Sequence, residues 1–322
     1  MIAGHHKLTV LALETDPNAW QEFYGAVEKV ADLVIYPTLE GLLSDDPRTS
    51  NTVILLDLDD LCGSPTALVA QLLDRRSRQR MGLTSSREIE GNLMDLRRWG
   101  IFHAAIKIPA VNADEVALFL DCVRNPANGF GLSRYLSNTV EMYNLPIETF
   151  EEKNRSIERV INHFATAGFD IHELFDVRLI LEEALNNAFF HAFKNEKGEE
   201  KYQLGKCTRL DPGDKIRVEY GNNAILAGFA VMDNAGQLSI RTILDKLERQ
   251  YNKEGVFDER GRGLYLSRLM SSRVIFSLEP GKRTQLIALF DETRRQNRPK
   301  PFFINVVGEE IHHGLGDDLE LD

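Results

Sequence analysis

A carboxylate, an amide and an imidazole follow one another at four-residue intervals near the middle of the chain. They are Glu183, Asn187 and His191, within the otherwise largely apolar residues 182–193, which have the spacing of a helix. Residues four apart lie about one turn apart on the same helix face, so the three side chains form a column. Alone, such a column is more often a solvated helix face. An amide ligand for Mg²⁺ with a carboxylate one turn earlier also suits phosphate chemistry, in which the nucleotide supplies further metal ligands.

Further residues suited to a nucleotide follow later in the chain. Asp233 ends an apolar stretch predicted to be a strand, where its carboxylate could accept a hydrogen bond from the exocyclic amine of a base. Gly236 would let the backbone approach the flat base. Glycines at a helix N-terminus offer backbone N–H groups to phosphates, and arginines add positive charge. The segment before the next predicted helix has both: Arg260, Gly261, Arg262 and Gly263.

Together these motifs resemble the GHKL ATPases, which have the Bergerat fold, and most of all the anti-sigma-factor serine kinases. The matching segments are residues 183–192, 233–236, 261–264 and 281–284. The resemblance implies ATP and Mg²⁺ as cofactors, Glu183 as general base, Asn187 as Mg²⁺ ligand and Asp233 as adenine ligand. It also implies that the glycines and Arg262 surround the phosphates and that Thr284 lies near the adenine. Residues 233–237 depart from the usual Asp-x-Gly-x-Gly, and the short, helical 240–260 segment suggests a different phosphate lid.

The first third of the chain alternates predicted strands with predicted helices. Apolar strands at residues 7–13, 32–36 and 52–56 are separated by helical segments at 19–30 and 39–43. This alternation predicts right-handed crossovers and a doubly wound parallel sheet. Ligands of such sheets bind outside the carboxyl ends of the strands.

Three acidic residues follow predicted strands at those ends. Glu14, Asp16 and Asp57 could share one pocket and hold a divalent cation. The alternative is that they are solvated turn residues. A hydroxyl, Thr84 or Ser85, and the ammonium group of Lys107 follow two later strands.

This arrangement resembles the response-regulator receiver domain over roughly the first 125 residues. The resemblance implies Asp57 as phosphoacceptor, Thr84 or Ser85 as switch hydroxyl and Lys107 as the phosphate-pairing cation. Receivers have two adjacent acids after the first strand, whereas this chain has Glu14 and Thr15. Metal binding therefore depends on Asp16.

With 322 residues, the chain is long enough for two domains. Clustered Pro, Asn and Gly residues at 125–131 mark the boundary. We predict a receiver-like domain at 1–125, a linker at 126–147 with a helix over 132–145, an ATPase domain at 148–292 and a tail at 293–322. Residues 299–307 of the tail could add a strand. The expected fold is α/β in the first domain and a Bergerat α/β sandwich in the second.

The composition excludes several classes of function. A formal net charge of −11 argues against nucleic acid as a partner. No apolar run is long enough to span a bilayer, and the first residues do not resemble a signal peptide, so we expect a cytoplasmic protein without a membrane partner.

The combined motifs predict a bacterial signalling protein that binds Mg·ATP and phosphorylates a serine of its partner, or sequesters that partner. The expected partner is an anti-anti-sigma-type protein or a sigma factor, and a homodimer remains open. Two alternatives stay open: a non-catalytic module that uses ATP to set its shape, and a histidine-kinase catalytic domain acting in trans.

Overall fold

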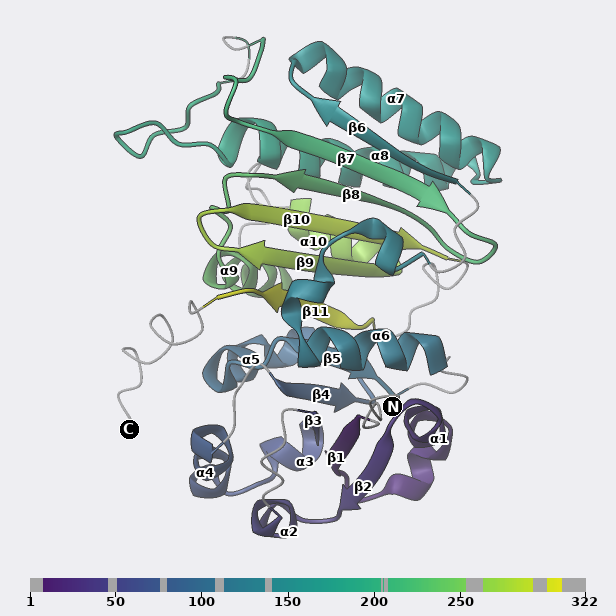
Figure 1. The fold of residues 1–322 in the computed structure, drawn as a ribbon, viewed down its shortest axis with the longest axis vertical. Helices are drawn as coiled ribbons and strands as arrows, with labels where there is room; N and C mark the ends of the chain where they lie inside the picture. Colours follow the sequence, from purple (N-terminus) through teal and green to yellow (C-terminus); the bar gives the residue numbers. More distant parts are fainter. Residues whose placement is uncertain are drawn as a thin grey trace, which may run out of the picture. The chain divides into compact units, whose positions relative to one another are not determined.

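The chain forms two compact units (Figure 1). The computed structural model describes residues 8–45, 51–75, 80–107, 113–136, 141–203, 205, 208–252, 263–291 and 300–308. The N-terminal unit comprises Met1–Asn128, Pro299–Asn305 and Asp318–Asp322, and the C-terminal unit comprises Gly129–Arg298 and Val306–Asp317. No helix in the described ranges is long and apolar enough to cross a membrane.

Five parallel strands form the sheet of the N-terminal unit, in the order β2-β1-β3-β4-β5. The strands are β1 (Thr9–Leu13), β2 (Asp32–Tyr36), β3 (Thr52–Asp57), β4 (Met81–Ser85) and β5 (His103–Ile106). This is the doubly wound order of flavodoxin-like folds, whose switch point lies between β1 and β3. The predicted doubly wound parallel sheet is confirmed. Glu14 follows β1 and Asp57 ends β3, so both lie at the switch point.

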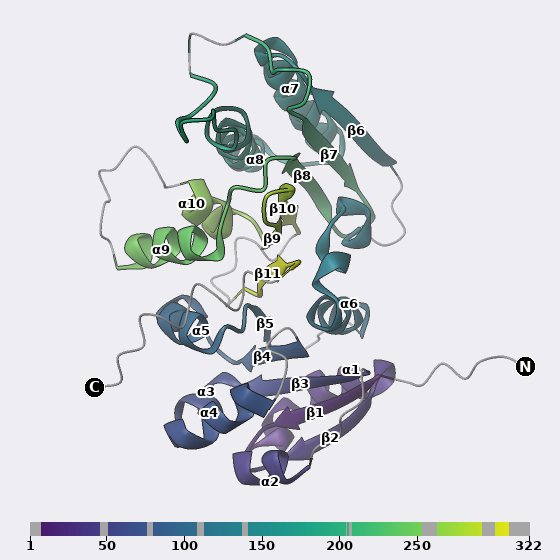
Figure 2. The ribbon, with the colours of Figure 1, turned by 60° about the vertical axis from the view of Figure 1, so that its left-hand side comes forward.

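Helices cover both faces of this sheet, and Figure 2 shows α5 and α6 on opposite sides of β5. Helix α1 packs against α6, and α2 packs against α4. The helices are α1 (Gln21–Val30), α2 (Leu39–Ser44), α3 (Leu58–Cys62), α4 (Thr66–Arg75), α5 (Leu93–Trp99) and α6 (Ala113–Arg124). Coverage on both faces explains why every residue of β3 is buried.

A strand from the end of the chain completes the N-terminal unit. Strand β11 (Phe302–Val306) pairs antiparallel with β5, with Phe302 opposite Ala104 and Phe303 opposite His103. The Phe303 ring stacks on Phe119 of α6, with ring centroids 5.7 Å apart. The strand predicted within residues 299–307 is therefore confirmed.

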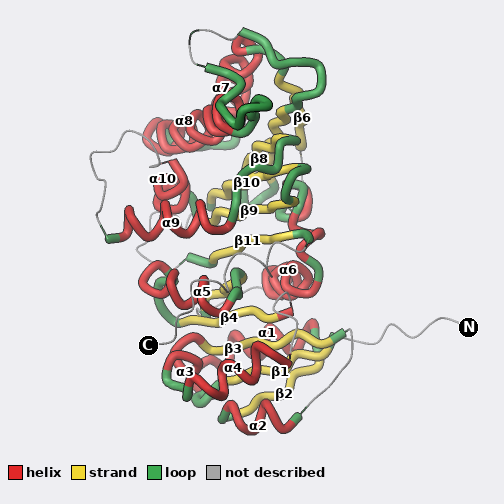
Figure 3. Tube along the Cα trace, turned by 90° about the vertical axis from the view of Figure 1, so that its left-hand side faces the viewer, coloured by secondary structure: helices red, strands yellow, loops and turns green. Residues whose placement is uncertain are grey.

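The C-terminal unit has an antiparallel sheet in the order β9-β10-β8-β7-β6. Its strands are β6 (Glu141–Ile147), β7 (Ile216–Asn222), β8 (Ala227–Asp233), β9 (Arg273–Glu279) and β10 (Arg283–Phe290). Its helices are α7 (Phe150–Thr166), α8 (Ile171–Asn186), α9 (Ile240–Tyr251) and α10 (Gly263–Met270). Figures 2 and 3 show α8, α9 and α10 together on one side of these strands. Capping boxes begin α7 and α8, and the one predicted from Asp170 and Glu173 is confirmed.

The helix predicted over residues 132–145 is wrong. A short 3₁₀ turn covers Leu132–Arg134, and Glu141–Ile147 is strand β6, which pairs with β7. Proline is compatible with an edge strand but not with a helix interior, which accounts for Pro146 in β6. The ring of Tyr143 stacks on Tyr220 of β7 at 4.9 Å. The second half of the expected linker is thus part of the sheet.

Candidate functional site

The polar column of Glu183, Asn187 and His191 extends from the end of α8 into a turn of different helical geometry. Helix α8 ends at Asn186, and Asn187–His191 form a π-helical turn instead of continuing the predicted α-helix. The two consecutive side chains Phe189 and Phe190 are both buried, and both contact the Phe150 ring. We attribute the wider turn to the packing of these adjacent rings. Single π turns within helices are frequent at functional sites.

A cavity of about 260 Å³ lies between the helices and the sheet of the C-terminal unit. Alternate residues of two neighbouring strands form its floor: Val231 and Asp233 of β8, and Thr284 and Leu286 of β10. The helical side contributes Asn187, His191, Thr242, Lys246 and Leu264. The structure therefore brings together three residues predicted from the sequence, Asn187, Asp233 and Thr284.

Asp233 and Thr284 are directly opposite each other in the β8–β10 ladder. Asp233 is 7% exposed, and burial raises the pKa of its carboxyl group to about 6, although Oδ1 accepts hydrogen bonds from the backbone N–H groups of Ala235 and Gly236. Thr284 Oγ1 is buried and has no hydrogen-bond partner among the described residues. A buried hydroxyl without a partner is costly. The pair therefore fits a ligand that presents both donors and acceptors, as the edge of adenine does.

Glu183 and Lys246 face each other across the same region. Burial raises the pKa of the Glu183 carboxyl, as does the charge of Glu182, while His191 and Lys246 oppose the shift. Burial lowers the pKa of the Lys246 ammonium, and the charge of Glu183 opposes that shift. The sequence analysis missed Lys246. The sequence could have indicated Lys246 through its four-residue spacing from Thr242, which places both side chains on one face of α9. Both side chains line the cavity.

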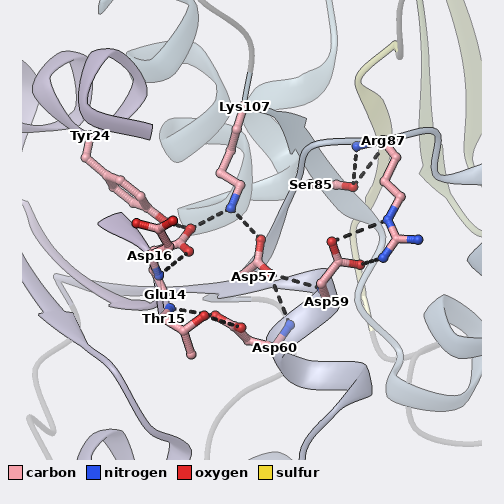
Figure 4. Close-up of polar contacts among 10 residues, drawn as sticks. All are labelled: Glu14, Thr15, Asp16, Tyr24, Asp57, Asp59, Asp60, Ser85, Arg87 and Lys107. Atoms are coloured by element: carbon pink, nitrogen blue, oxygen red, sulfur yellow. Dashed lines mark hydrogen bonds and ion pairs between the residues drawn. The ribbon is translucent and has the colours of Figure 1, made fainter. Parts of the chain in front are cut away.

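The N-terminal unit gathers its charged residues around one ammonium group (Figure 4). Lys107 Nζ lies 2.5 Å from Glu14 Oε2 and 2.6 Å from Asp57 Oδ2, and all three side chains are nearly inaccessible. Asp57 Oδ1 accepts hydrogen bonds from the backbone N–H groups of Asp59 and Asp60, both 3.0 Å long. Burial raises the pKa of the Asp57 carboxyl, and Lys107 opposes this. Both carboxylate oxygens of Asp57 are thus occupied.

The three acids Glu14, Asp16 and Asp57 do not form a cation site in the structure. The Asp16 side chain accepts a hydrogen bond from Ala19 N and caps a 3₁₀ turn, while its backbone N–H donates to Glu14 Oε1. In the described part of the chain, no group of three His, Cys, Asp or Glu side chains is arranged to hold a metal ion. The Lys107 ammonium lies between Glu14 and Asp57 and offsets part of their charge, so the metal set of Glu14, Asp16 and Asp57 stays a prediction that this geometry does not favour.

The remaining residues of this cluster are placed by the neighbouring strand and turns. Thr84 is fully buried and lies next to Asp57 in the β3–β4 ladder. The Ser85 hydroxyl is engaged with the Arg87 backbone, donating to its carbonyl and accepting from its N–H. Thr15, at the position of the second acid, donates from its hydroxyl to Asp60 Oδ1 at 2.7 Å. Of the two predicted hydroxyls, Thr84 is therefore the one beside Asp57.

Comparison with known proteins assigns the C-terminal region. Residues 150–288 match the family model described as "Histidine kinase-like ATPase domain". This region is similar to histidine kinase-like ATPase domains, and we call it the ATPase domain below. Among solved structures, the chain is similar to full-length FixJ from B. japonicum, with 9% identity and a TM-score of 0.29, over 55% of this chain and 73% of that chain. No match was found among curated proteins.

In the ATPase domain, Gly236 has a packing role that was not predicted. Its φ is +61°, and a Cβ atom would lie 2.4 Å from Lys282 N and 2.6 Å from Glu279 O. Its carbonyl accepts a hydrogen bond from Gly281 N. The glycine therefore lets the turn after β8 pack against the β9–β10 turn, and Gln237 and Leu238 line the cavity in its place. Gly236 is not among the cavity-lining residues, and its approach to a base stays a prediction.

Gly263 brings the N-terminus of α10 against Glu183 in this domain. A Cβ atom on Gly263 would lie 2.6 Å from Glu183 Oε2 and 2.9 Å from Glu183 Cβ. Only a residue without a side chain allows this approach. The predicted phosphate-binding residues Arg260, Gly261 and Arg262 lie outside the described residues.

Proposed function

We propose that the protein binds Mg·ATP in the cavity of its ATPase domain and transfers the γ-phosphoryl group to a serine of a partner protein, in the manner of an anti-sigma-factor serine kinase. The observation that carries the nucleotide assignment is the buried pair Asp233 and Thr284, whose hydroxyl has no partner among the described residues. Asp233 would accept from the exocyclic amine of adenine, and Thr284 would complete the hydrogen bonds of the ring edge. The same cavity contains Asn187, whose amide oxygen suits Mg²⁺.

The proposed transfer uses Glu183 as the general base. Its carboxylate would take the proton of the serine hydroxyl while the hydroxyl oxygen bonds to the γ-phosphorus, and the bonding electrons leave with ADP. The raised pKa of Glu183 supports this role, because a base is most effective when its pKa approaches the working pH. Mg²⁺ held by Asn187 would offset the negative charge of the phosphates. Lys246, Gly263 and the residues 260–262 are proposed to lie around the phosphates.

Two substitutions in the α8 column separate binding from transfer. We expect Asn187→Ala to weaken Mg²⁺-dependent ATP binding, measured by calorimetry. Glu183→Ala should largely retain binding but lower transfer by about 10²-fold or more, the usual range for a general base. Glu151→Ala is the control, because Glu151 is an exposed glutamate that pairs with Arg155 at 2.8 Å and is not among the cavity-lining residues. The absence of any binding heat at millimolar nucleotide would refute the assignment.

The partner is proposed to be a small anti-anti-sigma-type protein or a sigma factor, with a homodimer as the assembly to test. Incubation with γ-labelled ATP and proteins captured from the native cytosol would identify a phosphorylated partner. Binding of ATP without transfer or hydrolysis would instead assign the protein to non-catalytic, ATP-dependent modules. Label on a partner histidine would favour a histidine kinase acting in trans.

The N-terminal unit is proposed to be the input domain of this kinase. Asp57, with Thr84 and Lys107, remains the hypothetical phosphoacceptor, but Asp57 is only 4% exposed and both its oxygens are engaged. We therefore expect the signal to arrive by partner binding. Beryllofluoride should leave ATP affinity unchanged in the wild type and in Asp57→Asn. A shift of about 1–3 kcal/mol confined to the wild type would show a phosphorylation switch instead.

A further inference from the structure

A second, larger cavity lies at the end of the same sheet, on its other face. It has a volume of about 890 Å³, within the range of ligand pockets. Successive residues of a strand point to opposite faces. Asp233 and Thr284 line the nucleotide cavity, whereas the preceding row of paired residues, Pro146, Arg217 and Met232, lines the second one.

The wall of this second cavity combines an apolar floor with a basic rim. The floor consists of Pro146, Ile147, Leu210, Pro212, Ile216 and Met232. The rim includes the exposed side chains of Lys215 and Arg217, and neither forms an ion pair in the described ranges. Its acidic neighbours already have cationic partners: Glu148 pairs with Arg209, and Asp211 and Asp214 share Lys201, each at 2.7 Å. Two cations therefore remain available at the edge of an apolar surface.

The second cavity is physically connected to the nucleotide cavity through Asp233 and Asn234. Asp233 lines both cavities. The next residue, Asn234, holds the loop on the rim: its Oδ1 accepts from Lys215 N at 2.7 Å, and its Nδ2 donates to Gly213 O at 2.9 Å. A ligand that displaces this loop therefore acts directly on the strand end that carries Asp233.

We propose that the second cavity binds an acidic peptide segment of a partner protein and that its occupancy changes the nucleotide affinity of the ATPase domain. Carboxylates of the peptide pair with Lys215 and Arg217, since guanidinium groups bind carboxylates with two parallel hydrogen bonds. Apolar side chains of the peptide cover the accessible part of the floor, Pro146, Pro212 and Met232, which a simple anion would leave exposed. Peptide binding is independent of the proposed ATP function, and only the coupling rests on it.

The first experiment measures peptide binding without nucleotide. A fluorescently labelled short peptide of alternating glutamate and leucine is titrated with the full chain and followed by anisotropy. We expect the double variant Lys215→Glu/Arg217→Glu to bind at least tenfold more weakly, whereas Arg155→Glu, an exposed arginine of α7, should bind as the wild type does. Equal binding to both variants would overturn the proposal. So would equal binding of a glutamine–leucine peptide, or complete displacement by millimolar inorganic phosphate, which would indicate an anion site only.

The second experiment measures the coupling. Saturating peptide should change the ATP affinity at least threefold, and saturating ATP should change the peptide affinity by the same factor, because linkage is reciprocal. Asn234→Ala removes both side-chain hydrogen bonds to the loop and should reduce this factor while the peptide still binds. If the peptide binds but ATP affinity stays constant, the coupling is refuted. If ATP itself does not bind, the proposed function fails while the peptide site stands.

Discussion

The N-terminal cluster and the nucleotide cavity both contain acidic residues and a lysine, but these residues form ion pairs with each other only in the N-terminal cluster. In the N-terminal unit, Glu14 and Asp57 are buried against Lys107, which contacts both carboxylates. In the ATPase domain, Glu183 and Lys246 influence each other's pKa but form no ion pair with each other, and Lys246 lines an open cavity. The charged groups of the first arrangement are paired within the protein, although the buried Thr84 hydroxyl beside them has no partner among the described residues. The second leaves charges and a buried hydroxyl available to a ligand.

This difference shows that acids and a lysine at strand ends are not sufficient evidence for a site. Both clusters are equally suggestive in the sequence, because residue type and position do not reveal which groups pair with each other. Removing one partner of a buried ion pair destabilises the fold, because the other charge is left uncompensated. A buried polar group without a partner needs an explanation, and in a cavity a ligand can supply the missing partner.

The largest effect should follow from removing the lysine of the satisfied cluster. Lys107→Ala leaves two buried carboxylates uncompensated and should lower the free energy of unfolding by about 3–5 kcal/mol, measured by urea denaturation. The matched control is Lys246→Ala, which breaks no ion pair with any residue that the structure describes and should change stability by less than about 0.5 kcal/mol. If both variants lose the same stability, the two clusters do not differ as described.

A pH titration of stability should reveal the buried Asp233 carboxyl group of the cavity. Because burial raises the Asp233 pKa to about 6 from 3.8, the folded protein binds more protons than the unfolded chain between these values. Stability from this group is present below pH 4 and is lost as the pH rises to 6, with an upper limit of about 3 kcal/mol. The free energy of unfolding of the wild type minus that of Asp233→Asn, measured at each pH, isolates this loss. A difference that rises over the same pH range would contradict the assignment.

The smallest effect on stability is expected at Thr284. Thr284→Val removes a buried hydroxyl that has no described partner, so the variant should be as stable as the wild type or more stable by up to about 1 kcal/mol. Its ATP affinity should nevertheless fall about three- to tenfold, the value of one hydrogen bond. Thr242→Val is the control, since that hydroxyl lies 3.0 Å from Ser239 Oγ and its loss should cost stability. Lower stability with unchanged ATP affinity in Thr284→Val would reverse the interpretation.

The sequence predicted those features that depend on local spacing. The alternating strands and helices of the N-terminal unit, the capping box before α8 and the strand near the end of the chain follow from short-range patterns. Features set by tertiary contacts were missed. The π turn depends on how Phe189 and Phe190 pack, the need for Gly236 depends on a distant turn, and the pairing of Glu14 and Asp57 depends on where the Lys107 ammonium lies.

The order of elements along the chain has a consequence for synthesis. Strand β11 belongs with β5, and His103 Nε2 lies 2.7 Å from Asn305 Oδ1, two residues separated by 202 positions. A ribosome therefore produces the whole ATPase domain before the last strand of the N-terminal unit exists. Until then, the edge of β5 is unpaired and open to other strands. Domains usually fold in the order in which they emerge. Here the first unit to emerge is the last to be completed, so cells would need to protect that edge during translation.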